Sequence, residues 1–349
     1  MMRSAYAFIK LGISGLCGFL ASVSLACAAD VVKAGFTGNT GDVGFFVADE
    51  RGYFKQEGIE FQQIYFDSGA RMIAPLGTGD LDVGSAPANV GLYNAAARKI
   101  DVRVVADRGR TAKNNMYQTV MIRKDLIESG RFKDYRDLKG LKFAFPAPGV
   151  SSLSVFNEAL KKGGLTFADA EKTFMGYPQQ VVAFQNKAID GSMMIEPFGT
   201  ALVDMGSGVR FAPTEDFYPD DQISMIVYGD RLTKDRPEVA RRFMKAYVRA
   251  IRDFNDALDN GRWRNTPKAD EVVRILARRL ELKEEQIRRA YPHAVDPDGR
   301  VNTDSMRKDL AFFRQIGDVA DPTVTVETIL DESFVLSAVR DLGPYRPAP

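Results

Sequence analysis

Short apolar runs alternate with amphipathic stretches from residue 31 to about residue 212. The runs at 31–36, 59–66, 81–85 and 102–106 are rich in apolar and β-branched residues and predict strands. Between them apolar residues recur at helical spacing, as Phe46 and Tyr53 do seven positions apart. Because single helices separate the strands, we expect parallel pairing with right-handed crossovers, which defines an α/β sheet.

The same alternation begins again after residue 135. Strands are predicted at 141–145, 173–175, 192–195 and 209–212, and helices at 151–162, 178–189 and 198–205. Two further extended runs, 117–123 and 222–228, flank this second unit, and each leads into a charged break. We interpret them as two crossover strands by which the chain passes from one lobe to the other and back.

The pattern therefore predicts two lobes and a helical C-terminal extension. Lobe 1 comprises residues 30–116 and 229–349, and lobe 2 comprises residues 117–228 with both crossover strands. The tail from Pro237 is expected to be helical, because apolar residues recur there three or four positions apart. That apolar stripe consists of Phe243, Tyr247, Ile251 and Phe254.

Residues 1–29 have the pattern of a secretory signal peptide. Arg3 and Lys10 precede an uncharged apolar run of about fifteen residues, and small residues follow at cleavage spacing. The run is short for a membrane span, which needs about twenty residues, although an N-terminal anchor is the alternative. A second alternative is a lipid attached to Cys27, but the residues before it fit a lipoprotein signal poorly. We therefore expect a free periplasmic protein.

Composition narrows the classes of function. Lysine and arginine (47) nearly balance aspartate and glutamate (46), and loss of the leader would make the net charge −1, so nucleic acid is not an expected partner. Both cysteines, Cys17 and Cys27, lie in the leader, and His293 is the only histidine. A cysteine–histidine nucleophile, a zinc site and a serine–histidine–aspartate triad are therefore disfavoured, and we expect no metal, no cofactor and a monomer.

Small polar residues follow the predicted strands, where open α/β sheets bind their ligands. Thr37 and Asn39 follow the first strand and Ser85 ends the third, although each could belong to an ordinary turn. Ser151 and Ser152 open a helix whose free N–H groups could hold a carboxylate, sulfonate or phosphate; the alternative is a purely structural cap.

Other candidates carry charge or an aromatic ring. Glu196 ends a strand and could bind an amine or a ring N–H, or it could be a surface acid. Tyr117 begins the first crossover strand, where its ring could stack on a ligand. Three arginines in loops after the second and fourth strands could pair with an anion, although each alone would more often be solvated: Arg71, Arg108 and Arg110.

Three segments carry a resemblance to a known family. They are Gly52–Ile59 (GYFKQEGI), Gly79–Gly84 (GDLDVG) and Ile189–Gly191 ahead of Glu196–Pro197. The sequence resembles the solute-binding proteins of ABC importers for sulfonates, taurine, nitrate and thiamine-pyrimidine precursors. The resemblance implies a two-lobed periplasmic-binding-protein fold, the venus flytrap, whose ligand lies between the lobes and whose partners are a permease and an ATPase.

Carried over by position, the resemblance places six residues near the ligand: Thr37, Asn39, Ser85, Ser151, Ser152 and Glu196. One departure is Ile195, where some relatives have tryptophan. Eukaryotic relatives that make the thiamine pyrimidine consume a histidine and carry a cysteine cluster. This chain lacks that cluster, so the enzymatic branch is disfavoured.

The favoured hypothesis is a periplasmic binding protein for a small polar organic solute: a sulfonate, a carboxylate or a pyrimidine-like compound. The alternatives are an enzyme like those of thiamine-pyrimidine synthesis, with Glu196 or Asp107 as its titratable group, and a periplasmic ligand sensor. The charge of the ligand stays open. Paired serines and nearby arginines favour an anion, which we narrowly prefer, whereas Glu196 favours an amine or a heterocycle.

Overall fold

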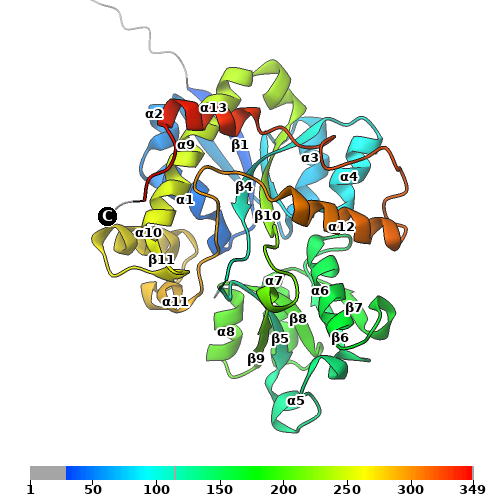
Figure 1. Cartoon of the computed structure of the whole chain (residues 1–349). Helices are drawn as coiled ribbons and strands as arrows, with labels where there is room; N and C mark the ends of the chain where they lie inside the picture. The colour runs from blue at the N-terminus through cyan, green and yellow to red at the C-terminus, as the bar shows by residue number, and fades with distance from the viewer. Residues whose placement is uncertain (1–28, 114, 348–349) are drawn as a thin grey trace, which may run out of the picture.

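The computed structural model describes residues 29–113 and 115–347, which form two lobes, each built on a five-stranded sheet (Figure 1). The predicted signal peptide lies almost wholly outside the described residues. The sheet of lobe 1 has the order β2–β1–β3–β10–β4 and contains β1 (Asp30–Phe36), β2 (Ile59–Tyr65), β3 (Val83–Ala86), β4 (Val102–Gly109) and β10 (Ser224–Gly229). The sheet of lobe 2 has the order β7–β6–β8–β5–β9 and contains β5 (Gln118–Arg123), β6 (Lys142–Phe145), β7 (Glu171–Phe174), β8 (Gly191–Ile195) and β9 (Gly208–Pro213).

The two sheets share one plan. In each, the strands joined by helices run in the same direction, as predicted. One antiparallel strand, which the chain enters as it arrives from the other lobe, lies between the edge strand and the rest of the sheet. The inserted strand is β10 in lobe 1 and β5 in lobe 2. The carboxyl ends of the parallel strands of both lobes face the space between the lobes. A chain that crosses this space therefore begins its first strand in the new lobe at that edge and runs away from it, antiparallel to the other strands.

This arrangement corrects the predicted role of the crossover strands. The sequence analysis placed both in lobe 2, but the second, Ser224–Gly229, belongs to the sheet of lobe 1. The segments that pass between the lobes are the connections at 110–117 and 214–223, which lie between consecutive strands of different sheets.

Helices cover both sheets. In lobe 1 they are α1 (Val43–Glu50), α2 (Tyr53–Gln56), α3 (Ile73–Thr78) and α4 (Val90–Ala97); in lobe 2 they are α5 (Lys124–Glu128), α6 (Ser151–Lys162), α7 (Tyr177–Gln185) and α8 (Phe198–Asp204). Short 3₁₀ turns lie at Thr40–Asp42, Gly69–Met72, Tyr135–Leu138, Phe167–Asp169 and Thr214–Asp216, and a π turn at Arg231–Asp235. Helix α4 begins at Val90, because the Asn89 side chain accepts a hydrogen bond from the Leu92 N–H and caps it.

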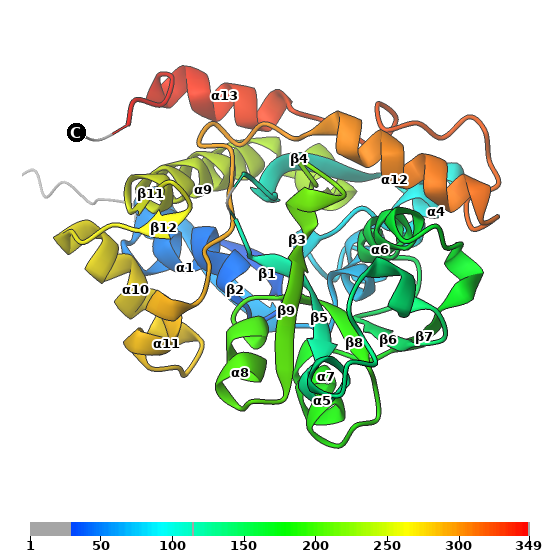
Figure 2. The same cartoon turned by 60° about the horizontal axis from the view of Figure 1, so that its bottom comes forward.

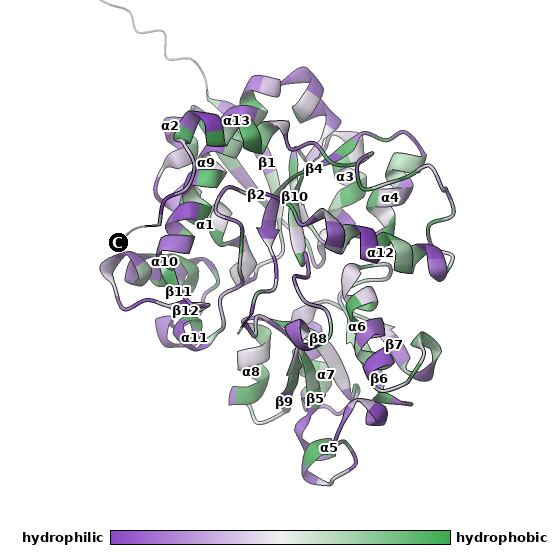
Figure 3. Ribbon diagram, viewed as in Figure 1, coloured by the Kyte–Doolittle hydropathy of each residue, from purple (hydrophilic) through white to green (hydrophobic). Residues whose placement is uncertain are grey.

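The C-terminal extension is helical, as predicted. It contains α9 (Pro237–Asp256), the hairpin β11 (Leu258–Asp259) and β12 (Arg262–Trp263), α10 (Pro267–Arg279), α11 (Glu284–Arg289), α12 (Thr303–Gln315) and α13 (Ser333–Leu342). The predicted stripe on α9 is buried, and Phe243 stacks on Phe54 of α2 with ring centroids 4.7 Å apart. Polar and hydrophobic residues alternate along the outer helices (Figure 3).

One helix of this extension reaches across to lobe 2. Helix α12 packs against α6 (Figures 1 and 2), and the rings of Phe312 and Phe167 meet edge to face at 5.1 Å. The extension therefore contacts both lobes rather than lobe 1 alone. Within the described ranges, no helix has the length and apolar character needed to cross a bilayer.

Candidate functional site

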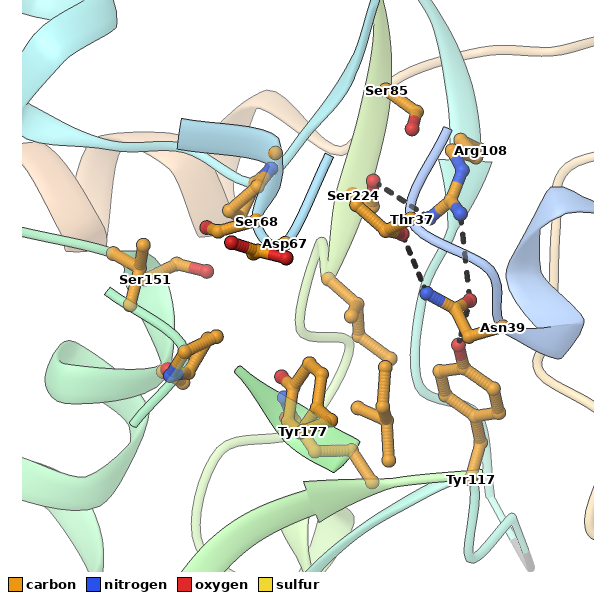
Figure 4. A pocket seen from close by; sticks show the side chains of 18 residues that line it. Thr37, Asn39, Asp67, Ser68, Ser85, Arg108, Tyr117, Ser151, Tyr177 and Ser224 are labelled. Atoms are coloured by element: carbon orange, nitrogen blue, oxygen red, sulfur yellow. Dashed lines mark hydrogen bonds between the residues drawn. The ribbon is translucent and has the colours of Figure 1, made fainter. Parts of the chain in front are cut away.

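A cavity lies between the lobes and is lined from both sheets (Figure 4). Lobe 1 contributes Thr37, Asn39, Asp67, Ser68, Gly69, Ser85, Pro87, Arg108, Ile223 and Ser224; lobe 2 contributes Tyr117, Gln118, Pro146, Val150, Ser151, Ser152, Tyr177 and Ile195. The space open to the centres of water-sized molecules is about 60 Å³. One water needs only about 10–15 Å³ on this measure, so the cavity suits a small solute.

Six of the seven predicted site residues line this cavity. Thr37 and Asn39 follow β1, Ser85 lies in β3, and Tyr117 directly precedes β5. The other two, Ser151 and Ser152, open α6 after β6. The carboxyl ends of parallel strands meet at one edge of a sheet, and the two sheets present these edges to each other.

The seventh residue, Glu196, is not among the lining residues. Its side chain is buried and accepts hydrogen bonds from the Arg210 guanidinium and from the Thr200 N–H at 3.0 Å. Burial raises the pKa of Glu196 above its usual value, although Arg210 opposes the shift. The expectation that this carboxylate faces the cavity is therefore wrong, because an arginine fourteen positions later along the chain holds it.

Glu196 instead takes part in a contact between the lobes through its backbone. Its carbonyl oxygen accepts a hydrogen bond from the Thr40 hydroxyl at 3.2 Å, and Thr40 belongs to the first 3₁₀ turn of lobe 1.

Arg108 is the one of the three candidate arginines that lines the cavity. Its guanidinium pairs with Asp42 at 2.6 Å and donates to the Ser224 hydroxyl at 3.1 Å. Burial is the largest single influence and acts to lower the pKa of Arg108, but the charge of Asp42 and its hydrogen bond, together with Tyr117 and Tyr247, outweigh it and the pKa is raised. The Nε atom of Arg108 is buried without a hydrogen-bond partner. By contrast, Arg110 pairs with Asp107, and Arg71 is exposed.

Asn39 and Tyr117 extend this network (Figure 4). The Asn39 side-chain oxygen accepts from the Tyr117 hydroxyl at 3.2 Å and from Arg108 at 3.4 Å. His293 packs against the Tyr117 ring at 5.2 Å and stacks on Phe254. Burial, together with the charge of Arg108, lowers the pKa of His293 to about 3, so this histidine is neutral at physiological pH.

The lobes also touch directly beside the cavity. The Val90 N–H donates to the Gly149 carbonyl at 2.8 Å, and the Ser151 N–H donates to the Ala88 carbonyl at 2.9 Å. Gly149 has a φ of +65°, and a Cβ there would lie 2.9 Å from the Cβ of Val90. The backbone can approach this closely because residue 149 is glycine.

This contact corrects the prediction of free N–H groups at the start of α6. The first of them, from Ser151, is already bonded to the other lobe. The hydroxyl of Ser152, in contrast, is buried without a partner in the wall of the cavity. A ligand with an acceptor atom would satisfy that hydroxyl, because an unpaired buried donor costs about 1–3 kcal/mol.

Sequence reasoning missed several lining residues. Asp67 and Ser68 lie just after β2, Tyr177 begins α7, and Ile195 ends β8. The rule that found Thr37 and Ser85 applies to them too, since each follows or ends a strand that points at the other lobe. Among the described residues, no group of three or more histidine, cysteine, aspartate or glutamate side chains could hold a metal ion.

Comparisons with known proteins agree with this architecture. A model of the NMT1-like family matches residues 28–265. A protein of Brucella abortus named as a binding protein is 26% identical over 259 residues, which cover 74% of this chain and 75% of the relative.

Two solved structures show the same fold. The alkanesulfonate-binding protein of Xanthomonas axonopodis pv. citri has a TM-score of 0.68 and 17% identity, covering 88% of this chain and 99% of that one. The periplasmic nitrate-binding protein of Synechocystis PCC 6803 has a TM-score of 0.72 and 15% identity, covering 90% and 89%. The chain therefore belongs to the NMT1-like family and has the fold of the periplasmic solute-binding proteins of ABC importers.

Proposed function

We propose that this chain is the substrate-binding component of an ABC importer, which captures a small polar organic solute between its lobes and delivers it to an inner-membrane permease and ATPase. The observation that carries the proposal is the cavity lined from both sheets and closed by the backbone bonds between 88–90 and 149–151. Relatives named for alkanesulfonate and nitrate binding support it.

Capture follows from the two-sided lining. A solute that touches residues of both lobes binds the closed form more tightly than the open form, so it shifts the population toward closure. The connections 110–117 and 214–223 would act as the hinge. The ligand contacts that we propose are Thr37, Asn39, Ser85, Tyr117, Ser151 and Ser152.

Export is part of the proposal. Residues 1–29 would act as a cleaved signal peptide, and the mature protein would work as a periplasmic monomer. A permease and an ATPase encoded beside its gene would favour an importer over a sensor with the same fold.

The positions of the buried carboxylates favour a binding protein over an enzyme. The enzyme hypothesis made Glu196 or Asp107 the titratable group, and either would have to face the cavity to act on a ligand. Asp107 bonds to Arg110, to the Gln222 side chain and to the Gly109 N–H. Since Glu196 is held by Arg210, neither candidate from the sequence analysis lines the cavity.

A binding experiment with one variant tests the proposal. Native mass spectrometry of the purified protein should reveal a small co-purifying solute, and that solute should raise the melting temperature. Ser152→Ala should lower its affinity by about tenfold without destabilising the apo protein, because the Ser152 hydroxyl has no partner in the folded chain.

Ser129→Ala, at an exposed position of lobe 2, is the matched control and should leave affinity unchanged. Failure of sulfonates, carboxylates, nitrate and pyrimidines alike to bind, with no co-purifying solute, would refute the function.

A further inference from the structure

We infer that the solute carries a protonated nitrogen, as in a primary amine or an amidine, and no net negative charge. The inference rests on the proposed function and names the class of ligand for the same cavity. Three observations support it. The charges that line the cavity disfavour an anion, N–H groups at the start of α6 are already hydrogen-bonded within the protein, and an aromatic ring lines the cavity.

The positive charge in the cavity is already neutralised. Arg108 is the one basic side chain among the described lining residues, and Asp42 pairs with it at 2.6 Å. The same guanidinium donates to Ser224 and Asn39. An anion would therefore meet an ion pair rather than a free cation, and its attraction to Arg108 would be largely offset by repulsion from Asp42.

A carboxylate lies in the cavity wall. Asp67 follows β2 and lies beside Ser68, on the side of the cavity opposite Arg108 and Asn39 (Figure 4). About half of its side chain is exposed, 49%, which places it at the mouth. Its partner Arg71 is 3.9 Å away and 70% exposed, and such a surface pair contributes little. Asp67 is thus available to a cation and repels an anion.

The N-terminus of α6 offers less to an anion than its sequence predicts. The Ser151 N–H is bonded to Ala88 across the lobes, and the Leu153 N–H is bonded to the Val150 carbonyl. Among the described residues, the side-chain donors buried in the wall without a partner are the Ser152 hydroxyl and the Arg108 Nε. A neutral oxygen or ring nitrogen of the ligand would satisfy either of them.

An aromatic ring favours a cation further. Tyr177 lines the cavity, and one face of its ring stacks on Phe198 at 5.7 Å. A cationic nitrogen of the ligand placed over the opposite, electron-rich face of this ring, within about 6 Å of its centre, would be attracted to it. The fold is shared with proteins named for alkanesulfonate and nitrate, but this cavity holds a carboxylate at its mouth and a single basic side chain that is already paired.

The test compares ligands of matched size by calorimetry on the purified protein. The cations are 2-aminoethanol and acetamidine, the anions are 2-hydroxyethanesulfonate and acetate, and the neutral member is acetamide. We expect the better cation to bind at least tenfold tighter than any anion or than acetamide. Asp67→Asn should remove most of that preference, and Asp67→Glu should keep it.

Glu60→Gln, at an exposed position of β2 outside the cavity, is the control and should bind as the wild type does. Tighter binding of an anion or of acetamide by the wild type would overturn the inference and leave the proposed function standing. An unchanged preference in Asp67→Asn would also overturn it. If none of the five compounds binds and no solute co-purifies, both proposals fail.

Discussion

Replacing Asp221 with asparagine should stabilise the protein by about 2–3 kcal/mol more at pH 8 than at pH 5. Asp221 lies in the connection 214–223, its side chain is fully buried, and its Oδ2 atom has no hydrogen-bond partner. Burial raises the pKa of Asp221 to about 7, from an ordinary value of 3.8. Asparagine has the shape of the protonated acid, so it removes the buried charge without opening a cavity.

The surroundings of Asp221 explain why its charge is poorly compensated. The Ser305 hydroxyl of α12 is 3.5 Å from Oδ1, and the Thr111 hydroxyl accepts from the Asp221 N–H. The nearby charges are the acids Asp309 and Glu215 and the base Lys308. Burial, and then Asp221 itself, raises the pKa of Asp309, which accepts a hydrogen bond from Tyr218 and faces Ser154 of α6.

The magnitude follows from the shift. The folded protein binds the Asp221 proton more tightly than the unfolded chain does, so the stability from this group is complete below its ordinary pKa of 3.8 and is lost progressively as the pH rises from there through 7. Each unit of pKa shift corresponds to about 1.4 kcal/mol. Between pH 5 and pH 8 the wild type should therefore lose about 2–3 kcal/mol relative to Asp221→Asn.

Urea unfolding followed by circular dichroism at pH 5, 6, 7 and 8 measures this difference. Asp304→Asn, an exposed substitution on α12, is the control, and its difference from wild type should stay constant within about 0.5 kcal/mol. Contributions from other groups cancel, because both proteins share them. A difference for Asp221→Asn that does not change with pH, or a variant less stable than wild type at pH 8, would refute the reasoning.

Three further outcomes follow from the structure. Because the pKa of His293 is lowered to about 3, the stability that this residue contributes is present above its ordinary pKa of 6.5 and is lost as the pH falls toward 3. The wild type should therefore lose stability between pH 7 and pH 5, and His293→Phe should reduce that loss by about 2 kcal/mol, as measured by urea unfolding. Asp42→Ala strands the buried charge of Arg108 and should lower the free energy of unfolding by about 3–5 kcal/mol, whereas a loss below about 1 kcal/mol would contradict the role of the pair. Val90→Pro removes the N–H that donates to the Gly149 carbonyl, and proline is tolerated there because Val90 is the first residue of α4. Small-angle scattering of the apo protein should show that the open form is about fivefold more populated in this variant. Val90→Ala keeps the N–H and should leave the population unchanged.

The sequence alone determined the alternation of strands and helices and the edge at which ligands could bind. Periodicity is a local property, so the runs that became β1, β6 and α6 could be recognised from their own residues. The positions just after those strands could be recognised too, and six of the seven candidate residues line one cavity.

Only the tertiary structure decided which charged side chains meet. Glu196 follows a strand as Thr37 does, but Arg210 turns its carboxylate away from the cavity. Arg108 and Arg110 are two positions apart, yet Asp42 holds only the first in the cavity wall. Such pairs form between residues that are distant in the sequence, so a local sequence pattern cannot predict them. The same holds for β10, whose sheet was fixed by the edge at which the returning chain entered lobe 1.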